Sequence, residues 1–152
     1  GVKAMNLGDD DRLVDMLVVK PGCQILTITS KGYGKRSDVE DYRLQNRAGK
    51  GIKAGVFNEK TGQLVNLKIV NEEEDVMVIS NNGTIIRMHV SDISMIGRNT
   101  QGVRIMGLKD SEVATVAIAP REEEEPDGEE AENAENTDIP DNSTSENLTD
   151  SE

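Results

Sequence analysis

Short apolar segments separated by turn residues recur between residues 24 and 119. The runs at 24–29 and 76–80 are rich in β-branched residues, a composition that favours strands. Asn82-Gly83 is a strong hairpin signal that leads into a strand-like segment at 84–90, and Lys31-Gly32 occupies the same turn earlier in the chain. No long amphipathic helix is visible. The pattern predicts an all-β fold, with further strands at residues 51–54, 64–70, 103–106 and 113–119.

The chain resembles itself at a constant offset of 51 residues. Residues 25–32 resemble residues 76–83, and residues 64–69 resemble 113–118 after a deletion of two positions. The offset also pairs Arg36 with Arg87, Arg47 with Arg98, and Lys53 with Arg104. A third, partial copy opens the chain, because residues 1–4 resemble 51–54 and residues 13–16 resemble 64–67. We therefore expect the chain to begin inside a repeat, with more repeats preceding it in the parent protein.

Repeats of about 50 residues that each hold several short strands indicate a propeller-like architecture, with an open β array as the alternative. The expected organisation has four parts: the end of a preceding blade at 1–22, the penultimate blade at 23–75, the last blade at 76–120 and a disordered acidic tail at 121–152. We expect a partial array of blades, in which each repeat needs its neighbours to bury its apolar face.

Charge is divided unevenly along the chain. Residues 1–120 carry 16 Lys/Arg and 15 Asp/Glu, whereas residues 121–152 carry one Arg and 14 Asp/Glu. The acidic segment has almost no apolar residues to bury, so it is predicted to be disordered. As a tethered polyanion it could compete with nucleic acid for the basic surface of the body, and the alternative is that it only improves solubility.

The body holds one locally basic segment, at residues 31–53. It has three acids, Asp38, Glu40 and Asp41, against seven cations: Lys31, Lys35, Arg36, Arg43, Arg47, Lys50 and Lys53. Glycines lie among the cations from residue 49 onward, and glycine lets a backbone turn tightly and approach a ligand closely. Such a segment is typical of a surface that contacts the phosphate backbone of nucleic acid, and an ordinary solvated loop is the alternative. With only two Tyr, one Phe and no Trp, the chain lacks a platform for stacking single strands.

Residues 45–51 of this segment, Gln-Asn-Arg-Ala-Gly-Lys-Gly, resemble the box motif of the gyrase A family, Q-[RK]-R-G-G-[RK]-G. Asn46 replaces a cation and Ala48 a glycine, while the other five positions match. Residues 93–104 and the acidic end are also similar to the last blades of the gyrase A family, so the resemblance covers about residues 1–120. It implies a β-pinwheel that binds and wraps duplex DNA around a basic rim, and it implies that the box at 45–51 is a secondary copy.

The second repeat keeps only Arg98 and Gly102 of the box, which predicts a structural turn there, with Arg87, Arg98 and Arg104 as weaker DNA contacts. The predicted DNA-contacting residues are therefore Lys31, Lys35, Arg36, Arg43, Gln45, Arg47, Lys50, Lys53, Arg87, Arg98 and Arg104.

The resemblance further implies a part in ATP-dependent negative supercoiling, with ATP and Mg²⁺ used by other regions of the parent protein. The implied partners are duplex DNA and, through those other regions, the gyrase B protein together with a second copy of gyrase A. The corresponding protein of topoisomerase IV is the nearest alternative, and a propeller-type protein-interaction scaffold is another.

We expect no catalytic residue and no metal ligand set in this chain. Cys23 is the only cysteine, and a catalytic thiol needs a base partner, for which His89 is the only histidine; no motif supports such a pair. Tyr33 and Tyr42 are expected to be structural. A single cysteine agrees with a reducing compartment, and no run approaches the ~18 apolar residues of a membrane span. The expected location is the cytoplasm, in association with the nucleoid.

Overall fold

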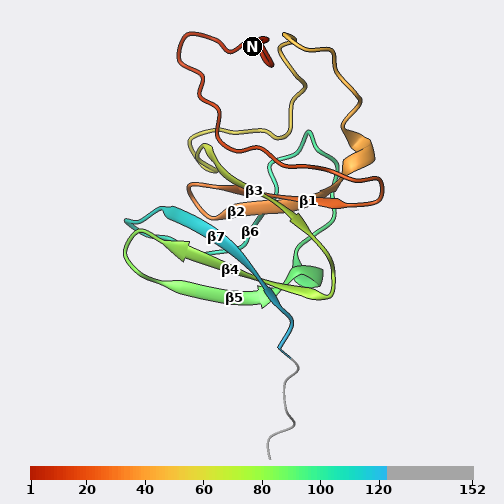
Figure 1. The fold of residues 1–152 in the computed structure, drawn as a ribbon. Coiled ribbons are helices and arrows are strands. Elements are labelled where there is room, and N and C mark those ends of the chain that lie inside the picture. The colour runs from red at the N-terminus through yellow and green to blue at the C-terminus, as the bar shows by residue number, and fades with distance from the viewer. Residues whose placement is uncertain (123–152) are drawn as a thin grey trace, which may run out of the picture. The chain divides into compact units, whose positions relative to one another are not determined.

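A computed structural model of the chain describes residues 1–122. It forms two antiparallel sheets (Figure 1). The first has the strand order β3-β1-β2-β6, with strands at Leu64–Val70, Gln24–Thr29, Tyr33–Asp38 and Val103–Arg104. The second has the order β5-β4-β7, with strands at Ile85–His89, Glu74–Ser80 and Val113–Pro120. Short 3-10 turns follow β2 at Val39–Asp41 (η1) and β5 at Val90–Asp92 (η2). The expected all-β fold is thus confirmed.

The two sheets repeat one another residue by residue. The order β3-β1-β2 in the first matches β7-β4-β5 in the second, as the offset predicted. Leu26 lies opposite Arg36 in the first sheet, and Met77 lies opposite Arg87 in the second, each shifted by 51 positions. Even the irregularity of the central strand recurs, between Ile28 and Thr29 and again 51 residues later. Sequence similarity between the copies therefore extends to backbone register.

The strand β6 connects the repeats. It belongs to the second repeat by sequence, yet it pairs with the edge of β2, where Tyr33 lies opposite Arg104 and Gly34 opposite Val103. The backbones approach so closely that a Cβ on Gly102 would lie 2.7 Å from the carbonyl oxygen of Gly34. Glycine at both positions is therefore what lets the second repeat close onto the first.

A single apolar cluster spans both sheets. Leu26 and Ile28 from β1 and Val76 and Val78 from β4 are almost fully buried, and Ile93, just after η2, packs with them. This core is aliphatic because aromatic residues are scarce in the chain. Burying β-branched and leucine side chains on both inner faces removes apolar surface from water and holds the repeats together.

Two predicted strands differ from the structure. Residues 51–54 form no strand, because the backbone here makes isolated hydrogen bonds and not the regular series that pairs two strands. The carbonyl of Lys53 accepts from the Arg98 side chain, and nearby Val56 N donates to Thr100 O. The strand expected at 103–106 is limited to Val103–Arg104. The acidic tail predicted at 121–152 lies, from residue 123 on, outside the described residues.

Candidate nucleic-acid interface

The predicted box lies on an exposed loop. Residues 43–48 have no strand neighbour, and the side chains of Arg43, Arg47, Lys50 and Lys53 are all exposed. Leu44 is fully exposed as well. The structure thus places four of the predicted cations on one loop, which carries no acidic residue between positions 42 and 53. Within residues 1–122 none of the four forms a salt bridge.

Backbone contacts with the N-terminal segment hold the tip of this loop. Ala48 N donates to Ala4 O at 2.9 Å, and Asn6 N donates to Gly49 O at 2.9 Å. Ala48 has a φ of 57°, the only positive φ among the non-glycine residues that the structure describes. The box motif has glycine at this position, which the left-handed conformation explains, since an L-residue there costs about 1–2 kcal/mol.

Gln45, the first residue of the box, contacts its own loop. Its amide nitrogen donates to the carbonyls of Arg43 and Leu44, at 3.3 Å each. Both bonds are local and exposed, so the amide can exchange them for an external acceptor at little cost.

Lys35 is among the predicted DNA-contacting residues, but the structure buries it. Only 2 % of Lys35 is exposed, because the turn at residues 97–100 of the second repeat folds over this side chain. The ammonium donates to the carbonyls of Gly97 and Thr100 and to the Thr100 hydroxyl, each at 3.1 Å, and also to the carbonyl of Arg98. Burial, with the positive charge of Arg98, lowers the pKa of Lys35 to about 8. Lys35 therefore holds the turn of the next repeat, and its contact with DNA stays a prediction without geometric support.

Arg36, another predicted DNA-contacting residue, is also buried, at 5 % exposure. Its guanidinium donates to the carbonyls of Ile93 at 2.7 Å and Ser91 at 3.2 Å, to Gln24 Oε1 at 2.8 Å and to the Glu72 carboxylate at 2.7 Å. Two of these acceptors follow β5, so Arg36 ties the first repeat to the second. The guanidinium beside Glu72 lowers the pKa of that carboxyl.

Arg87 occupies the equivalent place in the second repeat, and two of its partners, Asp75 and Glu122, occupy places equivalent to those of Gln24 and Glu72. It donates to Asp75 Oδ2 at 2.8 Å and to Pro120 O at 2.8 Å, and it pairs with Glu122 at 2.5 Å. Glu122 lies two residues beyond the third strand of its repeat, as Glu72 does in the first. The recurrence indicates that Arg36 and Arg87 serve the fold of each repeat.

Asp75 lies at the centre of this second cluster and is 2 % exposed. His89 Nδ1 lies 2.6 Å from Oδ1, and Glu122 N donates to Oδ2 at 3.3 Å. The hydrogen bond with His89, supported by Glu122 and Arg87 against the opposing effect of burial, lowers the pKa of Asp75 to about 2.

This low pKa predicts a pH-dependent effect of Asp75→Asn. Because the pKa is lower in the folded than in the unfolded chain, the stabilisation by Asp75 is complete above about pH 4 and is lost as the pH falls toward 2. We expect the Tm of Asp75→Asn to lie below that of the wild type at pH 6, and the gap to narrow between pH 4 and pH 2 in calorimetry. Asp92→Asn, at an exposed position, is the control; a gap of constant size for Asp75→Asn would contradict the prediction.

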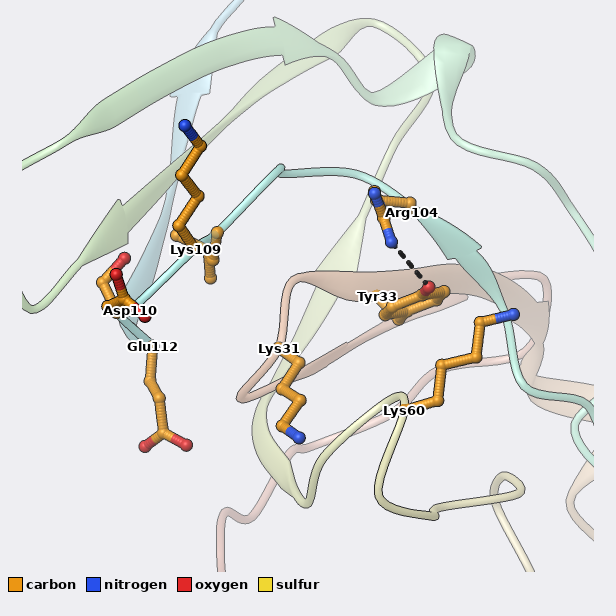
Figure 2. A pocket seen from close by; sticks show the side chains of 9 residues that line it. Lys31, Tyr33, Lys60, Arg104, Lys109, Asp110 and Glu112 are labelled. Atoms are coloured by element: carbon orange, nitrogen blue, oxygen red, sulfur yellow. Dashed lines mark hydrogen bonds between the residues drawn. The ribbon is translucent and has the colours of Figure 1, made fainter.

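A second group of cations surrounds Tyr33 (Figure 2). Arg104 donates to the Tyr33 hydroxyl at 3.3 Å and, with Lys60, lies 5.6–5.9 Å from the centre of its ring. The hydrogen bond from Arg104 lowers the pKa of Tyr33. Lys31 and Lys109 line the same pocket of about 400 Å³.

The pocket is mixed in charge, because Asp110 and Glu112 also line it. Sequence reasoning identified Lys31 and Arg104 but missed Lys60 and Lys109. At the offset of 49 that relates residues 64–69 to 113–118, Lys60 corresponds to Lys109, so the repeat pattern did offer an indication of both.

Arg98 is partly buried and donates to two carbonyls of the preceding repeat. Nε bonds Asp41 O at 3.0 Å, and a terminal nitrogen bonds Lys53 O at 2.6 Å. Of the eleven predicted side chains, the structure thus gathers Arg43, Gln45, Arg47, Lys50 and Lys53 on one loop and Lys31 with Arg104 at a separate pocket, while Lys35, Arg36, Arg87 and Arg98 bond within the protein.

Within residues 1–122 no group of His, Cys, Asp and Glu is arranged to hold a metal ion. In the same part of the chain, no helix is long and apolar enough to span a membrane.

A four-stranded and a three-stranded antiparallel sheet, related by a repeat and joined through β6, define a repeat protein of the β-propeller type. The family described as "DNA gyrase C-terminal domain, beta-propeller" matches residues 1–20, 24–71 and 74–120, and the chain belongs to this family.

Relatives that carry the name of the gyrase A protein support the assignment. That of Ureaplasma parvum serovar 3 is 44 % identical over 119 residues, covering 78 % of this chain and 14 % of the relative. That of Staphylococcus aureus strain MRSA252 is 46 % identical over 120 residues, covering 77 % and 14 %. The chain therefore spans about one seventh of the length of these relatives.

Solved structures share the fold. A DNA gyrase A C-terminal domain matches with a TM-score of 0.73 at 24 % identity, over 78 % of this chain and 41 % of that one. The C-terminal domain of a DNA topoisomerase IV matches with a TM-score of 0.71 at 20 % identity, over 79 % and 38 %. At these identities the likeness establishes the architecture alone.

Proposed function

We propose that this chain binds duplex DNA and helps to wrap it, as part of a gyrase A protein that supports ATP-dependent negative supercoiling. The observation that carries the proposal is the exposed loop with Arg43, Arg47, Lys50 and Lys53, which has no acidic partner in the described part of the chain. Unpaired cations on a projecting loop attract phosphates, and release of counterions from the DNA then favours binding of any sequence.

The geometry supports contact with the DNA backbone more than base reading. The loop offers cations and backbone N–H groups near glycines, but it forms neither a helix nor a two-stranded ribbon that could enter the major groove. A wrapping module needs this kind of contact, because it must follow DNA over many sequences. In the proposed parent protein, the partners are the gyrase B protein and a second copy of gyrase A, ATP and Mg²⁺ act elsewhere, and the complex works in the cytoplasm at the nucleoid.

Reversing two loop charges tests the proposal. We expect Arg47→Glu combined with Lys50→Glu to weaken binding to duplex DNA equally for unrelated sequences. The slope of log affinity against log salt should flatten by about two units, since two phosphate contacts are lost. Fluorescence anisotropy with labelled duplexes at salt concentrations of about 50–200 mM measures both quantities.

Lys20→Glu, which changes an exposed cation outside this loop, is the control and should leave the slope close to that of the wild type. An unchanged slope for the double variant would show that the loop does not lie at the DNA. Wrapping is tested separately, by ligating nicked circles in the presence of the protein and measuring the shift in linking number. Binding without a shift would favour a DNA-binding role that lacks wrapping, and absence of binding would favour a protein-interaction scaffold.

A further inference from the structure

Arg98 closes the base of the exposed loop. Its two acceptors, Asp41 O and Lys53 O, lie at either end of residues 42–52, which we call the cationic loop. A single guanidinium therefore bridges the point where this loop leaves the first repeat and the point where it returns. A planar fork with fixed N–H directions suits such a bridge, because it bonds two carbonyls without further ordering of the side chain.

The turn that carries Arg98 is itself held from the first repeat. Ile96 N donates to Arg36 O at 3.0 Å, Ser37 Oγ donates to Ile96 O at 3.2 Å, and the Lys35 ammonium bonds carbonyls on both sides of Arg98. Arg98 thus points from a fixed backbone. The first repeat thus places the buried Lys35 ammonium in the turn of the second repeat. The second repeat in turn places the Arg98 guanidinium at the base of the cationic loop.

The same inter-repeat contact occurs twice in the chain. Val56 N donates to Thr100 O at 3.0 Å, and Asn6 N donates to Gly49 O at 2.9 Å. Thr100 corresponds to Gly49 at the offset of 51, and Val56 to Asn6 at an offset of 50, which also relates residues 1–4 to 51–54. The turn of each repeat therefore docks against the segment that follows the loop of the repeat before it. Arg98 acts within a contact that belongs to the repeat itself.

We propose that Arg98 is a positioning residue, which fixes the cationic loop so that Arg43, Arg47 and Lys50 face the DNA, and that it does not itself contact phosphate. The part of this proposal that concerns DNA rests on the proposed function. It replaces the expectation that Arg98 contacts DNA, since both bonded nitrogens of the guanidinium already point at protein carbonyls.

Tryptic cleavage after Lys50 reads the order of the loop without any DNA. We expect Arg98→Met to be cleaved there about tenfold faster than the wild type, because two charge-assisted hydrogen bonds no longer close the loop. Arg98→Lys should be cleaved nearly as fast, since one ammonium cannot reproduce the fork. The matched control is Arg12→Met, the same change at an exposed arginine outside the cationic loop, and it should leave cleavage after Lys50 unchanged.

A double-mutant cycle then separates positioning from contact. Arg98→Met should weaken DNA binding in the wild-type background but add nothing when Arg43, Arg47 and Lys50 are already Glu, because it acts only through the loop. An additive loss, with cleavage after Lys50 unchanged, would overturn the proposal and make Arg98 a direct phosphate contact. A different outcome is that the wild type fails to bind DNA while cleavage after Lys50 is faster in Arg98→Met, as expected. That result would overturn the proposed function but would support the role of Arg98 in ordering the loop.

Discussion

Replacing Gly102 by alanine is expected to lower the free energy of unfolding by about 3 kcal/mol or more, against about 1 kcal/mol for Gly83→Ala. Both glycines have a positive φ, of 82° and 85°, so an alanine is strained to a similar extent at either position. The surroundings differ. A Cβ at Gly83 has nothing within 4 Å, whereas one at Gly102 lies 2.7 Å from the carbonyl oxygen and 3.0 Å from the carbonyl carbon of Gly34.

Strand β2 has no room to retreat from such a Cβ. Gly34 is itself enclosed by Ile28, Ile105 and the backbone of Thr27. Relief of the clash must therefore come from opening the β2–β6 pairing, which joins the two repeats. Urea unfolding of the full 152-residue chain, followed by far-UV circular dichroism, gives both free energies. Equal losses for the two variants would show that the backbones separate at little cost.

The repeat offset predicted the parts of the fold that depend on local pattern. Apolar alternation, the Asn82-Gly83 turn and the similarity of 25–32 to 76–83 were sufficient for β1, β4 and β5 and for the shared strand order. The box resemblance indicated Arg47 and Lys50, and the local excess of cations indicated Arg43 and Lys53, which the structure places on the same loop. These features arise from neighbours in sequence, where periodicity and turn chemistry act directly.

The burial of Lys35 and Arg36 was not predicted, because it depends on residues 91–104 folding over β2 from more than 50 positions away. One indication was available. Lys35 corresponds to Ile86 at the offset of 51, and an apolar residue in the other copy marks an inward position of the strand. Arg36 corresponds to Arg87, and an arginine kept outside the box motif in both copies indicates a role in the repeat's own fold.

Removing the Arg36 side chain is the second change expected to have a large effect. Arg36→Met leaves the carbonyls of Ser91 and Ile93 without their side-chain donor and deprives Gln24 and Glu72 of their shared partner. Each buried acceptor that loses its partner costs about 1–3 kcal/mol, so we expect the free energy of unfolding to fall by about 3 kcal/mol. Glu72 is 57 % exposed and can be solvated, so its carboxylate adds little to this loss.

Arg36→Lys should recover only part of this loss, because one ammonium cannot reach acceptors that the guanidinium meets with three different nitrogens. Arg43→Met, the same chemical change at an exposed position, is the control, with an expected effect below about 0.5 kcal/mol. Since the lost bonds to Ser91 and Ile93 cross between repeats, hydrogen exchange at residues 91–96 should quicken in Arg36→Met and stay unchanged in Arg43→Met. If Arg36→Met were as stable as Arg43→Met, the guanidinium would contribute nothing to the interface, and the core around Ile93 alone would hold the two repeats together.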